Sequence, residues 1–288
     1  MIRRQSGGSS PIGEVLAAIM LMAAPAALAQ EAPPAPTSGA ATSGPTGLQP
    51  ICADRPTKAN GPCTVDVGHI QIEADIINAS FMHAAGVTTD AWLVANPTLK
   101  YGLAPNLDIE VSIAPVQIVR TKEAGDAAGT LTGVGDLFFR VKFEFLNAPS
   151  VQAAIIPYVK APTARLGIGD GAWEGGLIVP VNVKLNPSLN LTLQPEFDEL
   201  ENGAGDGHHL AVSQDLSLAW SLPHNITAFA EVWGQWAFDP AGTQRQYSAD
   251  IAAALGLGRD SQIDAGINFG LNRATPGVAP YIGYSHRF

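Results

Sequence analysis

Charged side chains recur at every second position along several segments of this 288-residue chain. The clearest case is residues 135–146, where Asp136, Arg140, Lys142 and Glu144 alternate with apolar residues. Acids outnumber bases, with 26 Asp and Glu against 16 Lys and Arg, and the formal net charge is −10. Such side chains on one face of a sheet can pair with each other or select a charged solute. The negative charge argues against nucleic acid as a partner.

Catalysis would need a nucleophile beside a base, and the six histidines are the candidate bases. None has a serine in the setting of a nucleophile elbow. His208 and His209 are adjacent, and neighbouring side chains of an extended chain point to opposite faces. We therefore expect no enzyme, no metal site and no cofactor. The remaining candidate bases are His69, His83, His224 and His286.

Cys52 and Cys63 are the only cysteines. In an oxidising compartment an isolated pair of this kind forms a disulfide, and we expect one here. A metal site is the alternative, but two thiols without a histidine between them rarely hold a metal.

The start of the chain has the pattern of a secretory signal. Arg3 and Arg4 precede an apolar stretch at residues 15–28, and Ala27-Leu28-Ala29 offers a cleavage site before Gln30. We expect a signal peptide at 1–29 and a disordered linker at 30–50, rich in Pro, Ala, Ser, Thr and Gly. A short cysteine-bounded segment at 51–64 follows, and one β-barrel domain at 65–288.

From residue 65 onwards, segments of alternating polarity are separated by turn residues, as in β-strands with one apolar face. The 30 glycines and 22 prolines disfavour a helical protein. The predicted strands are 65–81, 90–101, 107–120, 135–146, 151–161, 173–185, 189–200, 209–221, 226–239, 246–256, 262–272 and 279–288.

Short and longer connections alternate along this set. An even number of strands with short turns on one side is typical of a bacterial outer-membrane barrel. The longer connections are expected at residues 83–89, 121–132, 162–171, 201–208 and 240–245. The chain ends on Phe288, with Tyr284 on the same face, as in strands that the barrel assembly machinery reads. We therefore predict an all-β, antiparallel transmembrane barrel of about 12 strands in outer-membrane lipid.

A soluble β-sandwich or lipocalin-like barrel would show the same alternation with its faces reversed. Export, strand number and aromatic residues near strand ends favour the membrane barrel. An outer-membrane lipid hydrolase and a structural or adhesive barrel with no open passage remain alternative functions.

In the membrane reading the polar set points inward. Its charges either pair across a narrow interior or line a passage that disfavours anions. Four aromatic residues share the inward positions and could stack on an aromatic solute: Phe138, Tyr158, Phe229 and Trp233. The inward charged set is Glu73, Asp75, Asp108, Glu110, Asp136, Arg140, Lys142, Glu144, Lys160, Glu174, Glu196, Asp198, Glu231, Asp250, Asp264 and Arg287.

Five prolines, at positions 97, 115, 157, 180 and 195, fall inside predicted strands. Each removes a hydrogen-bond donor from the sheet, so bulges or bends are expected. The alternative is a kinked wall that opens sideways and releases an apolar cargo into the membrane.

Several motifs together resemble a known family. They are Asp54-Arg-Pro56 with Gly68-His-Ile-Gln-Ile-Glu73, Asn96-Pro-Thr-Leu-Lys-Tyr-Gly102, Gly133-Val-Gly-Asp-Leu137, and Asn268-Phe-Gly-Leu-Asn272 through Phe288. The chain from about residue 50 resembles the outer-membrane family named "putative MetA pathway of phenol degradation". The resemblance implies a barrel that transports small aromatic or hydrophobic compounds. A plugging role for residues 51–64 is a further hypothesis, since they precede the first strand.

Overall fold

The computed structural model describes residues 47–288 apart from 85, 124 and 126. The predicted signal peptide and residues 30–46 of the predicted linker lie outside the described residues. No helix in the described part of the chain is long and apolar enough to cross a membrane.

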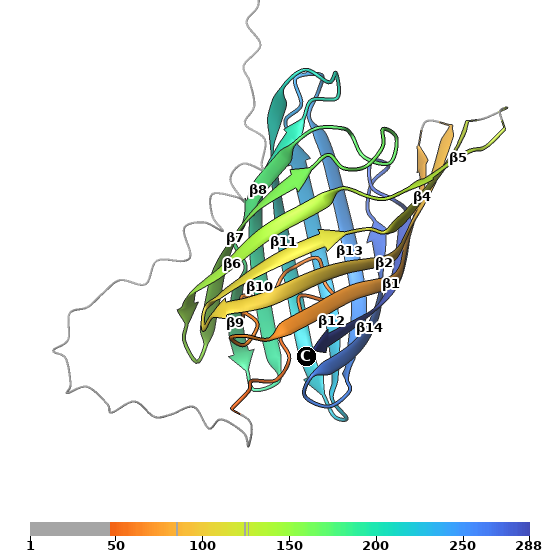
Figure 1. The fold of residues 1–288 in the computed structure, drawn as a ribbon. Helices are drawn as coiled ribbons and strands as arrows, with labels where there is room; N and C mark the ends of the chain where they lie inside the picture. Colours follow the sequence, from red (N-terminus) through yellow and green to blue (C-terminus); the bar gives the residue numbers. More distant parts are fainter. Residues whose placement is uncertain (1–46, 85, 124, 126) are drawn as a thin grey trace, which may run out of the picture. The chain divides into compact units, whose positions relative to one another are not determined.

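The described chain forms one antiparallel sheet of fifteen strands (Figure 1). Polar and apolar residues alternate along most of them, as a sheet with two different faces requires. The strands are β1 (Ile70–Ala84), β2 (Val87–Ala104), β3 (Leu107–Ile113), β4 (Val116–Glu123), β5 (Gly129–Gly133), β6 (Leu137–Asn147), β7 (Val151–Ala161), β8 (Glu174–Ile178), β9 (Val181–Asn186), β10 (Leu189–Glu201), β11 (His208–Leu222), β12 (Ile226–Ala237), β13 (Gln244–Gly256), β14 (Ser261–Gly270) and β15 (Val278–Arg287).

Three crossings of the wall are each broken into two strands: β3 with β4, β5 with β6, and β8 with β9. The fifteen strands therefore make twelve crossings. The sheet closes because β1 pairs with β2 on one edge and with β15 on the other, with Gln71 opposite Arg287. The prediction of a twelve-stranded antiparallel barrel is confirmed.

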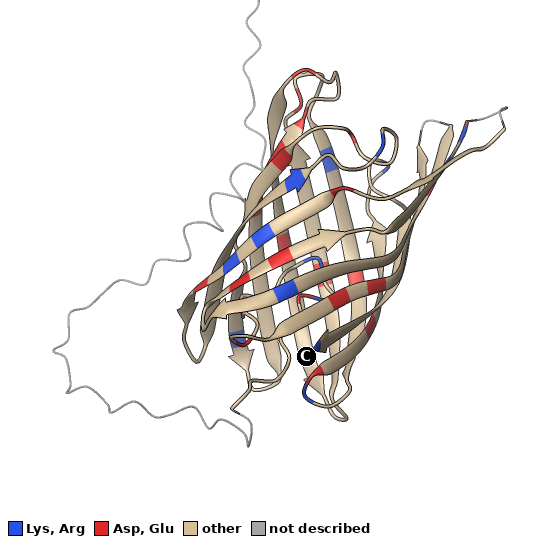
Figure 2. Ribbon diagram, in the orientation of Figure 1, with Lys and Arg blue, Asp and Glu red and all other residues tan. Residues whose placement is uncertain are grey.

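The two faces of the wall differ in polarity, with the apolar face outward as a membrane requires. On β1, the side chains of Gln71, Glu73 and Asp75 are 1, 3 and 4% exposed, whereas Ile70 and Ile76 are 42 and 50% exposed. Figure 2 shows the charged residues spread along the strands of the barrel. A soluble sandwich or lipocalin-like barrel would bury the isoleucines instead. Polar side chains therefore fill the interior, which we call the lumen, and apolar ones face outward.

Two predicted loops are wrong. Residues 83–89 and 121–132 were expected to be connections, but β1 continues to Ala84, β2 starts at Val87, β4 reaches Glu123 and β5 starts at Gly129. Val87 pairs with Glu123 and Thr121 with Gly129. These strand ends carry polar residues on both faces, so no apolar alternation marked them as strands. The predicted first strand also begins later, at Ile70 rather than at residue 65.

The five prolines occupy two kinds of position. Pro97, Pro157 and Pro195 lie inside β2, β7 and β10, whereas Pro115 and Pro180 lie in the breaks after β3 and β8. At the second break, Ala154 N donates to Pro180 O at 3.1 Å, and Val179 N donates to Pro195 O at 3.0 Å. Hydrogen bonds therefore bridge the break, and the wall continues across it.

Candidate functional site

Residues 51–64, which we call the lumen segment, contact inward side chains of β1, β2, β6, β10, β12, β13, β14 and β15. The predicted disulfide is present: Cys52 and Cys63 are joined, with their Cα atoms 6.2 Å apart. Gln71 Nε2 donates to Cys52 O at 2.8 Å, and Ile51 N donates to Arg259 O at 2.9 Å. The segment is thus closed on itself and tied to the barrel at its start.

Asp54 is the first charged anchor of the segment. Its carboxylate accepts from Lys142 Nζ at 2.7 and 2.8 Å and also pairs with Lys100. Lys100 pairs in turn with Glu73, whose Oε2 accepts from Asp54 N at 2.9 Å. Glu110 Oε1 lies 3.4 Å from Lys142 Nζ. Two cations and three carboxylates thus form one buried cluster across β1, β2, β3, β6 and the segment.

Arg55 contacts the neighbouring part of the wall, on β1, β14 and β15. Its guanidinium pairs with Asp75 at 2.6 Å and with Asp264 at 2.8 Å, and it lies 5.7 Å from the ring centroid of Tyr281. A side chain at Gly283 would collide with this guanidinium, so the close approach needs glycine. Burial lowers the pKa of Arg55, but hydrogen bonds and charge from Asp264 and Asp75 outweigh it, and the pKa is raised. Arg55 therefore remains a fixed cation against β1, β14 and β15.

Lys58 is the third charged anchor of the lumen segment, and it contacts β12 and β13. Its Nζ pairs with Asp250, donates to Ser248 Oγ at 3.1 Å and lies 5.8 Å from the ring centroid of Trp233. Its backbone N donates to Glu231 Oε1 at 3.0 Å. An inner-face tryptophan is therefore already covered by a cation of the chain itself.

Asn60 ties the tip of the lumen segment to β10. Its backbone N donates to Gln194 Oε1 at 2.7 Å, and its side-chain Nδ2 donates to the same oxygen at 3.1 Å. With the three charged anchors, the segment is thus held by strands from opposite sides of the wall. Two small polar cavities remain beside it, of about 160 and 140 Å³, and Arg55 lines both.

The structure buries most of the predicted inward charges completely and leaves Asp136, Arg140, Glu174 and Glu196 half-buried. Asp108 accepts from Val65 N at 3.0 Å, and Arg287 Nη1 pairs with Asp66. Arg140 Nη1 donates to Ser112 Oγ at 3.0 Å. The fully buried members are Glu73, Asp75, Asp108, Glu110, Lys142, Glu144, Lys160, Asp198, Glu231, Asp250, Asp264 and Arg287.

The predicted aromatic residues separate into two places. Trp233 touches the lumen segment, whereas Tyr158 donates to Asp198 Oδ1 at 2.7 Å, and its ring centroid lies 6.3 Å from that of Phe138. Phe229 is half-buried on the inward side of β12. The structure does not gather the four into one cluster.

Sequence reasoning missed two inward residues. Tyr281 carries the cation contact with Arg55, although the predicted inward set does not include it. Asp215 is 1% exposed, and neither of its carboxylate oxygens has a hydrogen-bond partner among the residues that the structure describes. Its place between Ser213 and Ser217 on the polar side of β11 was the signal that could have identified it.

At the end of the barrel with the longer loops, a second ion-pair cluster forms around Lys160. Its Nζ pairs with Asp170 and with Glu174, the latter at 2.8 Å, and lies 3.8 Å from Asp136. Burial raises the pKa of Asp170, but the hydrogen bond and charge of Lys160 together with backbone hydrogen bonds outweigh this, and the pKa is lowered. The loop after β7 is thereby held against the wall. No group of three or more potential metal ligands occurs among the residues that the structure describes.

One serine–histidine pair also went unnoticed. Ser261 Oγ lies 2.7 Å from His286 Nδ1, and Tyr284 Oη donates to Ser261 Oγ at 3.2 Å. Ser261 and His286 are partners across β14 and β15, far apart in sequence, so spacing could not bring them together. Within the described residues, no hydrogen bond links the other ring nitrogen to an orienting carboxylate or amide.

Comparisons with known proteins agree with this architecture. The model of the family described as "Putative MetA-pathway of phenol degradation" matches residues 53–288. The crystal structure of an outer membrane channel from Pseudomonas putida F1 is similar, with a TM-score of 0.63 and 16% identity, over 81% of this chain and 100% of that one. The β-domain of a Bordetella autotransporter gives 0.51 and 12%, over 77% and 100%. No curated protein matches in a sequence comparison. The shared fold is that of outer-membrane β-barrels.

Proposed function

Because this chain belongs to the family described as "Putative MetA-pathway of phenol degradation", we propose that it is an outer-membrane channel for small aromatic or hydrophobic compounds. We further propose that the lumen segment is its plug. The observation that carries the proposal is the set of charged anchors that Asp54, Arg55 and Lys58 make with opposite sides of the barrel.

The inner face suits this role in two respects. Its acids outnumber its bases, so cations are favoured over anions in the passage. Two inner-face rings, Trp233 and Tyr281, are covered by Lys58 and Arg55 while the plug is in place. Removal of the plug frees both rings for stacking with an aromatic solute.

The test compares conductance in planar bilayers between the mature chain and a variant lacking residues 51–64. We expect small or brief currents from the mature chain and a steady, cation-preferring current from the deletion variant, reduced by phenol. Unchanged conductance would reject the plug. An inserted barrel that never conducts would support the alternative of a structural barrel without a passage.

A point variant separates plug release from misfolding. Gly283→Ala displaces the flexible Arg55 guanidinium but leaves the strand pattern of β15 intact. Its control is Gly129→Ala on β5, where an added Cβ would meet only one atom, at 4.0 Å. Only Gly283→Ala should raise conductance, with both variants keeping the electrophoretic mobility of a folded barrel.

We also infer that the barrel is not an enzyme. Within the described part of the chain, the Ser261–His286 pair is the one arrangement that resembles hydrolytic machinery, and a catalytic histidine needs an orienting group on its other nitrogen. Fluorophosphonate labelling tests this directly. Covalent labelling of Ser261 that disappears in His286→Ala would contradict the inference and support the lipid hydrolase.

A further inference from the structure

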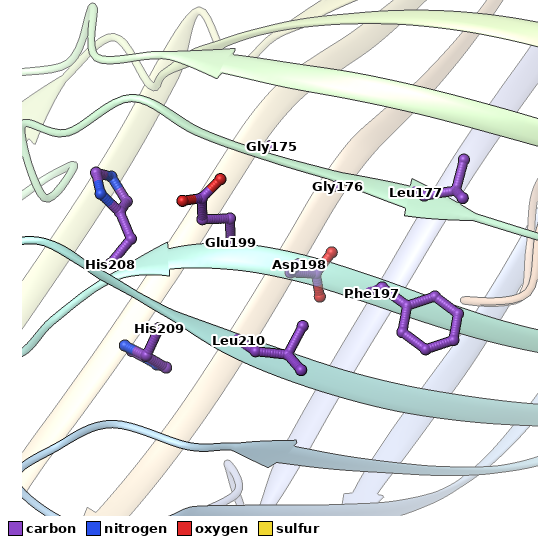
Figure 3. A pocket seen from close by; sticks show the side chains of 9 residues that line it. All are labelled: Gly175, Gly176, Leu177, Phe197, Asp198, Glu199, His208, His209 and Leu210. Atoms are coloured by element: carbon purple, nitrogen blue, oxygen red, sulfur yellow. The ribbon is translucent and has the colours of Figure 1, made fainter.

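A hollow of about 590 Å³ interrupts the outer face of the wall where β8, β10 and β11 run side by side (Figure 3). Leu177, Phe197 and Leu210 line it, and all three belong to the exposed apolar belt. The hollow is separate from the lumen segment and has no part in the proposed passage.

The hollow exists because a glycine replaces a side chain in the belt. Gly175 pairs with Val159 on β7 and with Glu199 on β10, so a row of side chains has a gap at its position. A Cβ at Gly175 would lie 2.8 Å from the Tyr158 carbonyl oxygen, a distance that forces the strands to shift. Glycine is therefore required here, and the gap is a built feature of the wall.

The two ends of the hollow differ in polarity. Figure 3 shows Glu199 and His208 towards one end, with Leu177 and Phe197 towards the other. His208 Nε2 lies 2.8 Å from the Trp173 carbonyl oxygen, which can only accept, so Nε2 carries the proton. In this tautomer Nδ1 is an acceptor. The polar end thus presents a carboxylate and an imidazole nitrogen, both acceptors.

The depth of the hollow matches the edge of a bilayer. A strand rises about 3.3 Å per residue and is tilted by about 40°, so Phe197 lies roughly 20 Å above Leu189 at the start of β10. Glu199 lies roughly 25 Å above it, which is about the height of the apolar band of such barrels. Trp173, 62% exposed, stands beside the polar end, where interfacial aromatic residues gather.

We propose that this hollow binds one phospholipid with a primary-amine head group. An acyl chain fills the space along Leu177, Phe197 and Leu210, because a hollow that faces hydrocarbon is filled by hydrocarbon. The ammonium group donates hydrogen bonds to Glu199 and to His208 Nδ1. A choline head group has no N–H to donate, so phosphatidylcholine lacks these bonds.

The experiment uses the full-length mature protein in nanodiscs that contain photoactivatable phosphatidylethanolamine or phosphatidylcholine with a diazirine on the acyl chain. Cross-links are mapped by mass spectrometry. We expect labelling around Leu177, Phe197 and Leu210 to favour the ethanolamine lipid by about fivefold or more. Glu199→Gln should reduce this preference.

Phe197→Ala and Phe269→Ala provide the matched pair, because both remove an exposed phenylalanine of the belt, from β10 and β14. Labelling at the hollow should fall only in Phe197→Ala. Equal labelling by the two lipids, or labelling at the hollow no stronger than around Phe269, would show unselective annular lipid and overturn the proposal. A preference for a lipopolysaccharide probe over both phospholipids would overturn it as well.

Discussion

Lys142 Nζ lies 2.7 and 2.8 Å from the two carboxylate oxygens of Asp54, although 88 positions separate the residues in the chain. Lys100 pairs with the same carboxylate from β2. Burial raises the pKa of Asp54, but the charges of Lys100 and Lys142 together outweigh it and hold the pKa well below its usual value. Asp54 is therefore an ionised anchor that holds the lumen segment to the wall.

Asp54→Asn should loosen the segment. Loss of the charge leaves two buried ammonium groups with fewer partners, which in buried ion pairs costs about 3 kcal/mol or more. We expect the fraction of time spent in conducting states to rise at least tenfold in bilayer recordings. Asp260→Asn is the control, because Asp260 pairs with Arg287 in a turn outside the lumen segment. An equal rise in both variants would show that Asp54 is not the anchor.

Acid should release the segment. The pKa of Asp54 is lower in the folded protein than in an unattached carboxyl group. Its contribution to holding the segment is therefore complete above about pH 4 and is lost as the pH falls through the pKa of the folded state. Conductance should therefore rise as the pH is lowered below about 4. Since other carboxylates titrate too, the measurement is the difference between the parent and Asp54→Asn. Identical pH profiles would contradict the assignment.

The disulfide should protect the segment from proteolysis. The disulfide closes a loop with a sequence separation of 11. Breaking a disulfide that closes a loop of about this size removes roughly 3 kcal/mol of stabilisation. In Cys52→Ser/Cys63→Ser, trypsin should cut after Lys58 much faster than in the parent. Cutting after Lys122, in β4 at the far end of the wall, serves as the internal control. Equal rates at Lys58 in both proteins would mean that the ionic anchors alone suffice.

The apolar belt predicts a depth-dependent penalty for charge. Leu216 lies near the middle of β11 and Leu185 near the end of β9, and both are exposed on the outer face. Leu216→Arg should cost about 2–4 kcal/mol and Leu185→Arg about 0–1 kcal/mol in unfolding from lipid vesicles. Equal costs would contradict the position of the belt.

Much of the wall could be predicted from alternation alone. In residues 136–145 charged and apolar residues alternate with a single exception, Phe138, and β6 covers nearly the same range. Where alternation fades, prediction failed: Thr88 and Thr121 lie in β2 and β4, yet both fell in expected loops. Polar residues on both faces carry no periodic signal, and only pairing with a neighbour identifies them as strand.

The sequence by itself determined the class of fold, the number of crossings and the disulfide, because period, turn residues and cysteine content are local properties of the chain. Alternation alone does not say which face points inward, because it is the same for a barrel and its inside-out counterpart, and the tertiary structure showed that the polar face does. It also decided the partners of Asp54 and of Ser261. Asp54 and Lys142 are 88 positions apart in the chain, and Ser261 meets His286 through the register of the neighbouring strands β14 and β15. Alternation specifies neither contact.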